Sequence, residues 1–359
     1  MFSSTKKKET LIAAHWPLFG NVHLFKHITD MNSVCQKRSL GNMVAFILSL
    51  VILSATLSVS ALAEDSLQIY LQRGGRWLLK DDYTNALKDF QSALRLDPDN
   101  FDALKNLGVA HSALGHQEQA RVYLERAYQI DPFKPGLSNN LGALFSNEGN
   151  SAEAIKYFEA AVSLDSNNAV YLTNLGQEYS KIGRISKALP ALHRARELEP
   201  DKAVILFSLG NCYAASNSLD SAEFYFERSV MAGGKTAQLF YFLGTIKSRL
   251  GKMDEAEQSF KQALTYNTRH KDCLQSLGML YISQQRYAET AEQARRVVDI
   301  DSTSYAGWIL LGAAYALNGM TAQADSILQR LFAVDSTIGF KMLDFIGNEQ
   351  KKRQASPQE

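Results

Sequence analysis

The sequence contains few cysteines, and this shortage excludes some classes of protein. Only three of the 359 residues are cysteines, namely Cys35, Cys212 and Cys273. Three cysteines are too few for the disulfide framework of a small secreted domain. The histidines that follow residue 63 are scattered along the chain, at His111, His116, His193 and His270. We therefore predict no metal site, no cofactor and no catalytic residue.

The chain also has almost no net charge. Its 38 Lys and Arg residues nearly balance its 37 Asp and Glu residues, for a formal net charge of +1. The segment before Glu64 carries a net charge of +4, which leaves −3 for the remainder. Because a strongly basic face is the electrostatic signature of a nucleic-acid binder, we do not expect DNA or RNA among the partners.

A long apolar run near the N-terminus is the first positive feature. The stretch from Met43 to Leu62 has no charged residue, follows Lys37 and Arg38, and is bounded by Ala63. A positive segment, an apolar run and small residues at its exit are the pattern of a secretory signal peptide. We therefore predict a signal peptide over residues 31–63, with cleavage after Ala63. Residues 1–30 show no clean period, so we interpret them as a non-native extension and Met31 as the start.

A membrane anchor over residues 43–62 is the alternative to cleavage. A charge-free stretch of this length is long enough to cross a bilayer. Its second half contains several Ser and Thr residues, which favours the signal peptide. Both interpretations place the rest of the chain on the far side of a membrane. We therefore expect an exported protein that is periplasmic or secreted, or else anchored by this segment.

Glycine recurs at every thirty-fourth position, at Gly74, Gly108, Gly142, Gly176, Gly210, Gly244, Gly278 and Gly312. Twelve positions after each glycine stands Ala86, Ala120, Ala154, Ala188, Ala222, Ala256, Thr290 or Ala324. A glycine within a helix costs about 1 kcal/mol relative to alanine, so its recurrence requires compensation from packing. We expect the small residues of each pair to let two helices approach closely.

Each repeat unit contains two apolar stretches of helical period around a short turn. In the second unit the first stretch includes Leu104, Leu107 and His111, and the second includes Leu124 and Ala127. The turn position holds glycine in five units and asparagine in one, whereas Asp81 and Gln285 depart from this pattern. Proline follows the second stretch in three units and ends the helix there. The pattern predicts one helix hairpin per unit.

The recurring Leu-Gly, Tyr, Gly, Ala, Phe, Ala and Pro at these offsets resembles the tetratricopeptide repeat, a family that has this same period. The resemblance implies an all-α, right-handed α-solenoid with the first helices lining a concave groove. The eight units are 67–100, 101–134, 135–168, 169–202, 203–236, 237–270, 271–304 and 305–338. Phe340, Leu343 and Ile346 predict a capping helix over residues 339–350, followed by a disordered tail over 351–359.

The resemblance also implies which side chains face the groove. These are residues near the Leu-Gly pair of each first helix, namely Asn106, Asn140, Asn174, Gln177, Phe207, Asn211, Tyr241, Thr245 and Arg249. Asparagine amides both donate and accept hydrogen bonds, which suits pairing with the backbone of an extended peptide. We therefore predict a groove that binds a partner segment.

The functional expectation is a non-catalytic scaffold, an exported adaptor that binds protein or peptide partners in an envelope assembly. The repeats and the leader leave no other segment of domain size in this sequence, which disfavours a repeat-fused transferase. A regulatory or targeting subunit of an enzyme encoded elsewhere is a second alternative. A homodimer is a further alternative, in which two copies pair through an exposed end of the stack, because the end of a solenoid has no neighbouring repeat.

Overall fold

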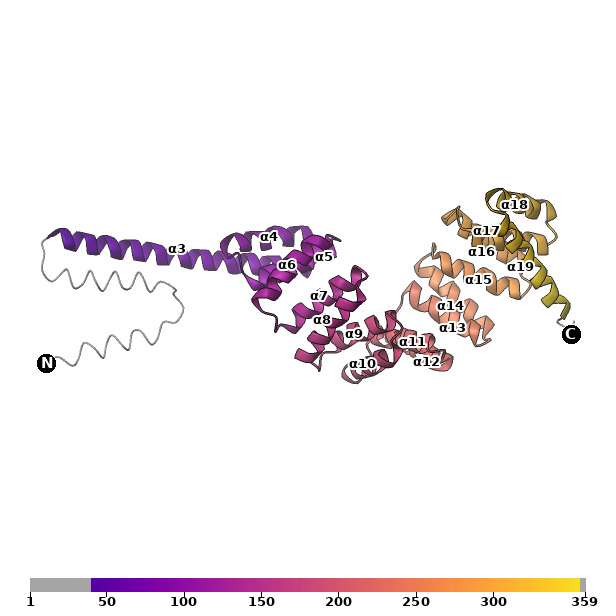
Figure 1. Cartoon of the computed structure of the whole chain (residues 1–359), viewed down its shortest axis with the longest axis horizontal. Coiled ribbons are helices and arrows are strands. Elements are labelled where there is room, and N and C mark those ends of the chain that lie inside the picture. Colours follow the sequence, from indigo (N-terminus) through magenta and orange to yellow (C-terminus); the bar gives the residue numbers. More distant parts are fainter. Residues whose placement is uncertain (1–39, 356–359) are drawn as a thin grey trace. The chain divides into compact units, whose positions relative to one another are not determined.

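The computed structural model describes the backbone of residues 40–355 and the side chains of residues 46–54 and 64–351. In this part of the chain every regular element is an α-helix (Figure 1). The helices are α3 (Leu40–Leu78), α4 (Tyr83–Leu96), α5 (Phe101–Ala113), α6 (Gln117–Ile130), α7 (Pro135–Asn147), α8 (Ser151–Leu164), α9 (Ala169–Lys181), α10 (Ile185–Leu198), α11 (Ala203–Ala215), α12 (Leu219–Met231), α13 (Ala237–Arg249), α14 (Met253–Tyr266), α15 (Lys271–Ser283), α16 (Tyr287–Ile300), α17 (Tyr305–Leu317), α18 (Thr321–Val334) and α19 (Ser336–Ala355).

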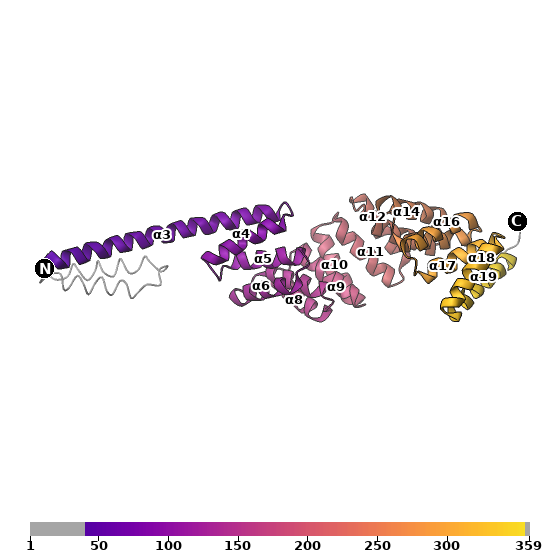
Figure 2. The same ribbon diagram turned by 90° about the horizontal axis from the view of Figure 1, so that it is seen from above.

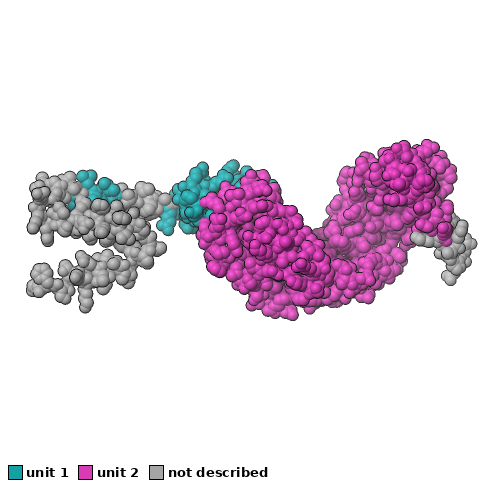
Figure 3. All heavy atoms as spheres, viewed as in Figure 1, with its two compact units in different colours: residues 1–114 teal, residues 115–359 magenta. Residues whose placement is uncertain are grey.

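The helix starts reproduce the sequence period. From α5 to α17 the first helices of successive pairs begin at the same position of each repeat, and the second helices from α4 to α18 do the same. The chain divides into two compact units, residues 1–114 and 115–359 (Figure 3). Within the second unit successive helices pack against one another (Figure 2). The predicted all-α helical-repeat solenoid is confirmed.

The eight turns between paired helices share one backbone conformation. A residue with positive φ stands at the same position of every repeat, at Asp81, Gly115, Gly149, Gly183, Asn217, Gly251, Gln285 and Gly319. The sequence departs from glycine at Asp81 and Gln285, yet these residues adopt φ values of 57° and 61°. The left-handed conformation costs a non-glycine residue about 1–2 kcal/mol. The packing of the two helices therefore imposes the turn conformation, and Asp81 and Gln285 adopt a positive φ although they are not glycine.

The repeated glycines make room for a large side chain rather than only for alanine. A Cβ atom added to Gly142, Gly210 or Gly244 would lie 2.5–2.7 Å from the ring of the phenylalanine sixteen positions later. The expected contact with the residue twelve positions on exists at the backbone, where Thr290 Oγ1 donates to the Gly278 carbonyl at 3.4 Å. At Gly176 an added Cβ would also lie 3.3 Å from the backbone oxygen of Ala188, so the glycine accommodates both the close approach of the helices and a buried Phe or Leu.

In the first unit α3 and α4 form the first hairpin. Arg73 replaces the leucine of the other repeats, and its Nε and a terminal nitrogen donate to Asp89 at 2.7 and 2.5 Å. Trp77 donates to the same carboxylate at 3.1 Å. This bidentate ion pair joins the two helices of the hairpin.

The predicted extension over residues 1–30 lies outside the described residues. The predicted leader lies partly outside them, because they exclude residues 31–39 and the side chains of 40–45 and 55–63. The backbone of α3 continues as one helix from Leu40 through the predicted cleavage site at Ala63 to Leu78. Within the described part of the chain, none of the helices combines the length and the apolar character that crossing a bilayer requires.

The C-terminal helix differs from the prediction in its bounds. It begins at Ser336 because the Asp335 carboxylate accepts the Thr337 backbone N–H at 2.8 Å, as an N-cap does. It continues to Ala355, so the first five residues of the expected disordered tail are helical, and residues 356–359 lie outside the described part. Ile338 and Met342 are buried against α17 and α18, and Met342 contacts Gly312. A capping contact therefore exists, but Ile338 and Met342 make it, with Ile346 packed beside them, whereas Phe340 and Leu343, which the apolar pattern assigned to it, are 59% and 43% exposed.

Candidate functional site

Hydrogen bonds between neighbouring first helices keep them parallel and in register. Near the middle of the two helices the Asn174 amide, in α9, donates to Asn139 Oδ1, in α7, at 2.8 Å. Near the helix ends Lys181 Nζ donates to the Ser146 carbonyl at 2.9 Å. The Gln177 amide joins α9 to the next first helix by donating to Ser208 Oγ at 2.7 Å. The first helices therefore present equivalent repeat positions side by side on one surface.

One hollow on this surface, which we call the amide hollow, lies between α7 and α9. It has a volume of about 330 Å³ and is lined by Ala143, Ser146, Asn147, Phe158, Asn174, Gln177, Glu178 and Lys181. Each of the Asn174 and Gln177 amide groups uses one N–H in the helix-to-helix bonds, and each also has a second N–H and a carbonyl oxygen. The hollow therefore offers both donors and acceptors to a bound backbone.

Charge in the amide hollow is neutralised internally. The Glu178 side chain is almost fully buried, and its Oε1 lies 3.3 Å from Lys181 Nζ. Burial alone would raise the pKa of Glu178, but hydrogen bonds from Ser146, Ser151 and Lys181 together hold that pKa below its ordinary value. The hollow thus contains a fixed carboxylate–ammonium pair with no net charge.

A second hollow, which we call the methionine hollow, lies between α13 and α15 and has a volume of about 560 Å³. It is lined by Tyr241, Thr245, Ser248, Arg249, Met253, Phe260, Asp272, Gln275, Ser276, Met279, Leu280 and Ser283. The Tyr241 ring lies 5.0 Å from that of His270, whose Nδ1 accepts the Cys273 backbone N–H at the start of α15. This volume is within the range of ligand-binding clefts.

Five of the nine predicted groove residues line these two hollows. Asn174 and Gln177 belong to the amide hollow, whereas Tyr241, Thr245 and Arg249 belong to the methionine hollow. The structure does not bring the other four to either one. Half-buried Asn106, in α5, belongs to the first unit. Asn140 and Asn211 are half-buried on α7 and α11.

Phe207 has a structural role that the prediction did not anticipate. Its ring lies 5.8 Å from Phe226 and 5.9 Å from Phe242, within an apolar cluster of the second unit. Repeat position therefore does not by itself separate a groove residue from a core residue, because a large apolar side chain turns toward the nearest buried surface.

The hollows also contain residues that the sequence analysis missed, including Asn147, Gln275, Met279 and Ser283. A signal for three of them was present. Gln275, Met279 and Ser283 stand exactly one repeat after Tyr241, Thr245 and Arg249. Advancing each predicted residue by one repeat would have found them, because equivalent positions face the same surface in a solenoid.

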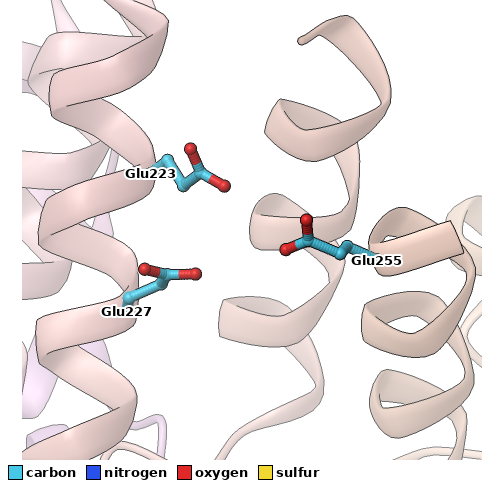
Figure 4. Close-up of side chains that lie close together, drawn as sticks. All are labelled: Glu223, Glu227 and Glu255. Atoms are coloured by element: carbon cyan, nitrogen blue, oxygen red, sulfur yellow. The ribbon is translucent and has the colours of Figure 1, made fainter. Parts of the chain in front are cut away.

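A group of three carboxylates, Glu223, Glu227 and Glu255, lies near the second hollow (Figure 4). Lys247 Nζ is 3.0 Å from Glu227 and 2.8 Å from Glu255. Lys252 Nζ is 2.6 Å from Glu223. Each carboxylate is thus paired with an ammonium group, and the cluster is a salt-bridge network that joins α12 to the next helix pair.

Arg286 is the centre of a second ionic network, between α14 and the turn before α16. It donates to Glu257 at 2.5 Å, contacts Glu289, and stacks 4.1 Å from the centre of the Tyr281 ring. Hydrogen bonding by Arg286 lowers the pKa of Glu257 to about 2, from an ordinary value of 4.5. Because the pKa is lowered in the folded state, this carboxylate stabilises the fold most above pH 4.5.

We expect the pH dependence of stability to report this network. The contribution of Glu257 is lost progressively as the pH falls from about 4.5 to about 2, so the free energy of unfolding should fall over this interval. Urea unfolding at several pH values would measure it. Glu257→Gln should be less stable at neutral pH and lose part of the slope, whereas Glu153→Gln, at an exposed ion pair, should keep it. Equal slopes in the Glu257 variant and the wild type would contradict the assignment.

Successive stretches of the chain match family models of the tetratricopeptide repeat. The tetratricopeptide repeat family models match residues 102–134, 136–168 and 173–236, and a TPR repeat model matches residues 79–115. The chain belongs to the tetratricopeptide-repeat family. Residues 217–333 also match the model of the middle TPR-like domain of cilia and flagella-associated protein 70. Tetratricopeptide repeats are typical of protein–protein interaction scaffolds.

Individual relatives are similar over limited stretches. The chain is 35% identical over 81 residues to cellulose synthase operon protein C of Pseudomonas fluorescens (strain SBW25), a match that covers 22% of this chain and only 6% of that protein. Among solved structures, the APC/C hetero-tetramer Cut9–Hcn1 matches with a TM-score of 0.61 at 17% identity, covering 72% of this chain and 52% of that one. A tetratricopeptide repeat protein from Parabacteroides merdae matches with a TM-score of 0.54 at 15% identity, covering 69% and 98%. At these identities the structural matches show the shared fold alone.

Proposed function

We propose that this tetratricopeptide-repeat protein is a non-catalytic scaffold that binds an extended segment of a partner protein along its first helices. The observation that supports it best is the amide hollow, where Asn174 and Gln177 stand on one helix face with hydrogen-bonding capacity to spare. Side-chain amides can pair with the N–H and C=O groups of a backbone whatever its sequence.

We also propose that the protein is exported, as a periplasmic or secreted protein or one anchored by residues 43–62, and acts in an envelope assembly. The charge-free run and the small residues before Ala63 support export. Recovering the chain from an envelope fraction and sequencing its N-terminus would test both points. A chain that begins at Glu64 indicates cleavage, and a cytosolic chain that begins at Met1 would rule out export.

Affinity purification of the full chain from envelope extract is the decisive experiment for the scaffold. We expect a stable protein partner whose binding becomes about tenfold weaker in the double variant Asn174→Ala, Gln177→Ala, because each lost hydrogen bond contributes about 0.5–1.5 kcal/mol. Asn318→Ala with Gln323→Ala makes the same chemical change on exposed residues of the last repeat and should bind as the wild type does.

The melting temperatures of both double variants serve as the folding control. Unchanged affinity in the hollow variant, with both variants folded, would exclude the amide hollow as the contact. Failure to recover any partner, together with turnover of a substrate by the pure protein, would overturn the non-catalytic assignment.

A second candidate function is a regulatory or targeting subunit of an enzyme encoded elsewhere. The short match to a protein named for the cellulose synthase operon favours this candidate. The same purification separates the two, because recovery of an enzyme whose activity changes on binding supports the subunit, whereas recovery of non-catalytic partners supports the scaffold.

A further inference from the structure

The methionine hollow carries one charge of each sign. Arg249 is the last residue of α13, and Asp272 is the second residue of α15. Both side chains are exposed, and within the described part of the chain neither makes an ion pair. The Arg249 guanidinium donates to Asn217 Oδ1 at 2.5 Å, which fixes its direction without neutralising it. The neighbouring charges of Lys247 and Lys252, in contrast, are paired with carboxylates.

The two charges lie at opposite ends of the hollow. Its lining includes three pairs of residues that are one repeat apart, namely Tyr241 with Gln275, Thr245 with Met279, and Arg249 with Ser283. Helices that present equivalent positions to one hollow run parallel and in register. Arg249 is therefore level with Ser283, eleven positions along α15 from Asp272. At a rise of 1.5 Å per residue the charges are separated by about 16 Å along the helix direction.

The surface between these charges is uncharged and partly apolar. Tyr241 and Met279 provide the accessible apolar part, with Met279 42% exposed, whereas Phe260 and Leu280 lie buried beneath them. A methionine side chain is flexible and polarisable, so it adapts to apolar groups of different shape. The Thr245 hydroxyl donates to the Tyr241 carbonyl at 2.9 Å, so its proton is already used within α13.

We infer that the methionine hollow binds a short stretch of the partner segment that carries a basic, a bulky apolar and an acidic side chain over about five residues. This inference rests on the proposed function and specifies the chemistry of its ligand. An extended chain rises about 3.3 Å per residue, so about five residues span the roughly 16 Å between the charges. The basic side chain pairs with Asp272, the apolar one contacts Met279 and Tyr241, and the acidic one accepts hydrogen bonds from Arg249.

Peptide selection on the full chain tests this chemistry. A phage-displayed library of random dodecapeptides is selected in parallel on the wild type, Arg249→Glu and Asp272→Lys, and enriched peptides are measured by fluorescence anisotropy at low and high salt. The wild type should enrich peptides with a basic and an acidic residue on either side of an apolar one. Arg249→Glu should lose the preference for the acidic residue, and Asp272→Lys the preference for the basic one. Each reversal should weaken wild-type peptides about tenfold at low salt and less at high salt.

The matched control variants reverse charges at positions outside the methionine hollow. Lys341→Glu and Asp325→Lys reverse exposed charges on α19 and α18 and should leave the selection unchanged. Circular dichroism confirms that all four variants fold. Peptides that bind the wild type and both hollow variants equally would overturn this inference and leave the proposed function standing. If no peptide is enriched on the wild type, the proposed function itself fails, and the inference fails with it.

Discussion

Replacing Phe226 with alanine is expected to lower the free energy of unfolding by about 3–5 kcal/mol. The side chain is fully buried, fills the space above Gly210, and packs against the rings of Phe207 and Phe242. The cavity left by its removal is surrounded by helices that cannot close over it without moving the neighbouring repeats. Such a loss is large compared with the total stability of about 5–15 kcal/mol of most folded domains.

Urea unfolding followed by circular dichroism measures this effect. Phe224 is the matched control, because it has the same side chain on the same helix but is 52% exposed. Phe224→Ala should change the stability by less than about 1 kcal/mol. Phe226→Leu should lose less than half as much as Phe226→Ala, because Leu192 fills the equivalent space above Gly176 in the preceding repeat. Similar losses for Phe224→Ala and Phe226→Ala would contradict the packing described for this hairpin.

Gly210→Ala is expected to destabilise the fold, although alanine is the better helix former. An added Cβ would lie 2.5 Å from two ring carbons of Phe226. Overpacking of this kind costs about 1–3 kcal/mol, whereas the gain in helix propensity is about 1 kcal/mol. The steric cost exceeds the gain in helix propensity because the ring is fully buried, and the net loss should reach up to about 2 kcal/mol.

Gly347→Ala is a control for which the expected change in the free energy of unfolding has the opposite sign. Gly347 lies within α19, and an added Cβ there would meet no atom within 4 Å. The substitution should therefore raise the free energy of unfolding by up to about 1 kcal/mol. A double variant, Gly210→Ala with Phe226→Ala, should lose less than the sum of the single losses, because the added methyl group enters the vacated space. Strict additivity would show that these two residues do not share one packing site.

The sequence predicts the repeat architecture well because its main signals are local. The recurring glycines and the turn glycines act within a few residues of the backbone that they determine. So do Pro98, Pro132 and Pro200, each of which stands two residues after the end of a helix. Asp81 and Gln285 show where local rules stop, since their turns keep a positive φ without glycine. There the packed hairpin supplies the constraint.

The sequence predicts the candidate site less completely. It places Asn174, Gln177 and Arg249 on the surface that contains the hollows, because a repeat position fixes the side of the helix. It does not predict that Asn174 pairs with Asn139, or that Phe207 joins the core. Those outcomes depend on the distances between helices and on which neighbouring side chains are large.

By itself, therefore, the sequence determined the period, the helix pairs, most of the turns and the side of the first helices on which the two hollows lie. The tertiary structure decided which side chain fills the space above each glycine and which residues meet in the two hollows. It also placed Arg249 and Asp272 at opposite ends of one hollow. The physical reason is that helical periodicity acts through neighbours a few residues apart, whereas these contacts join residues 12 to 35 positions apart across packed helices.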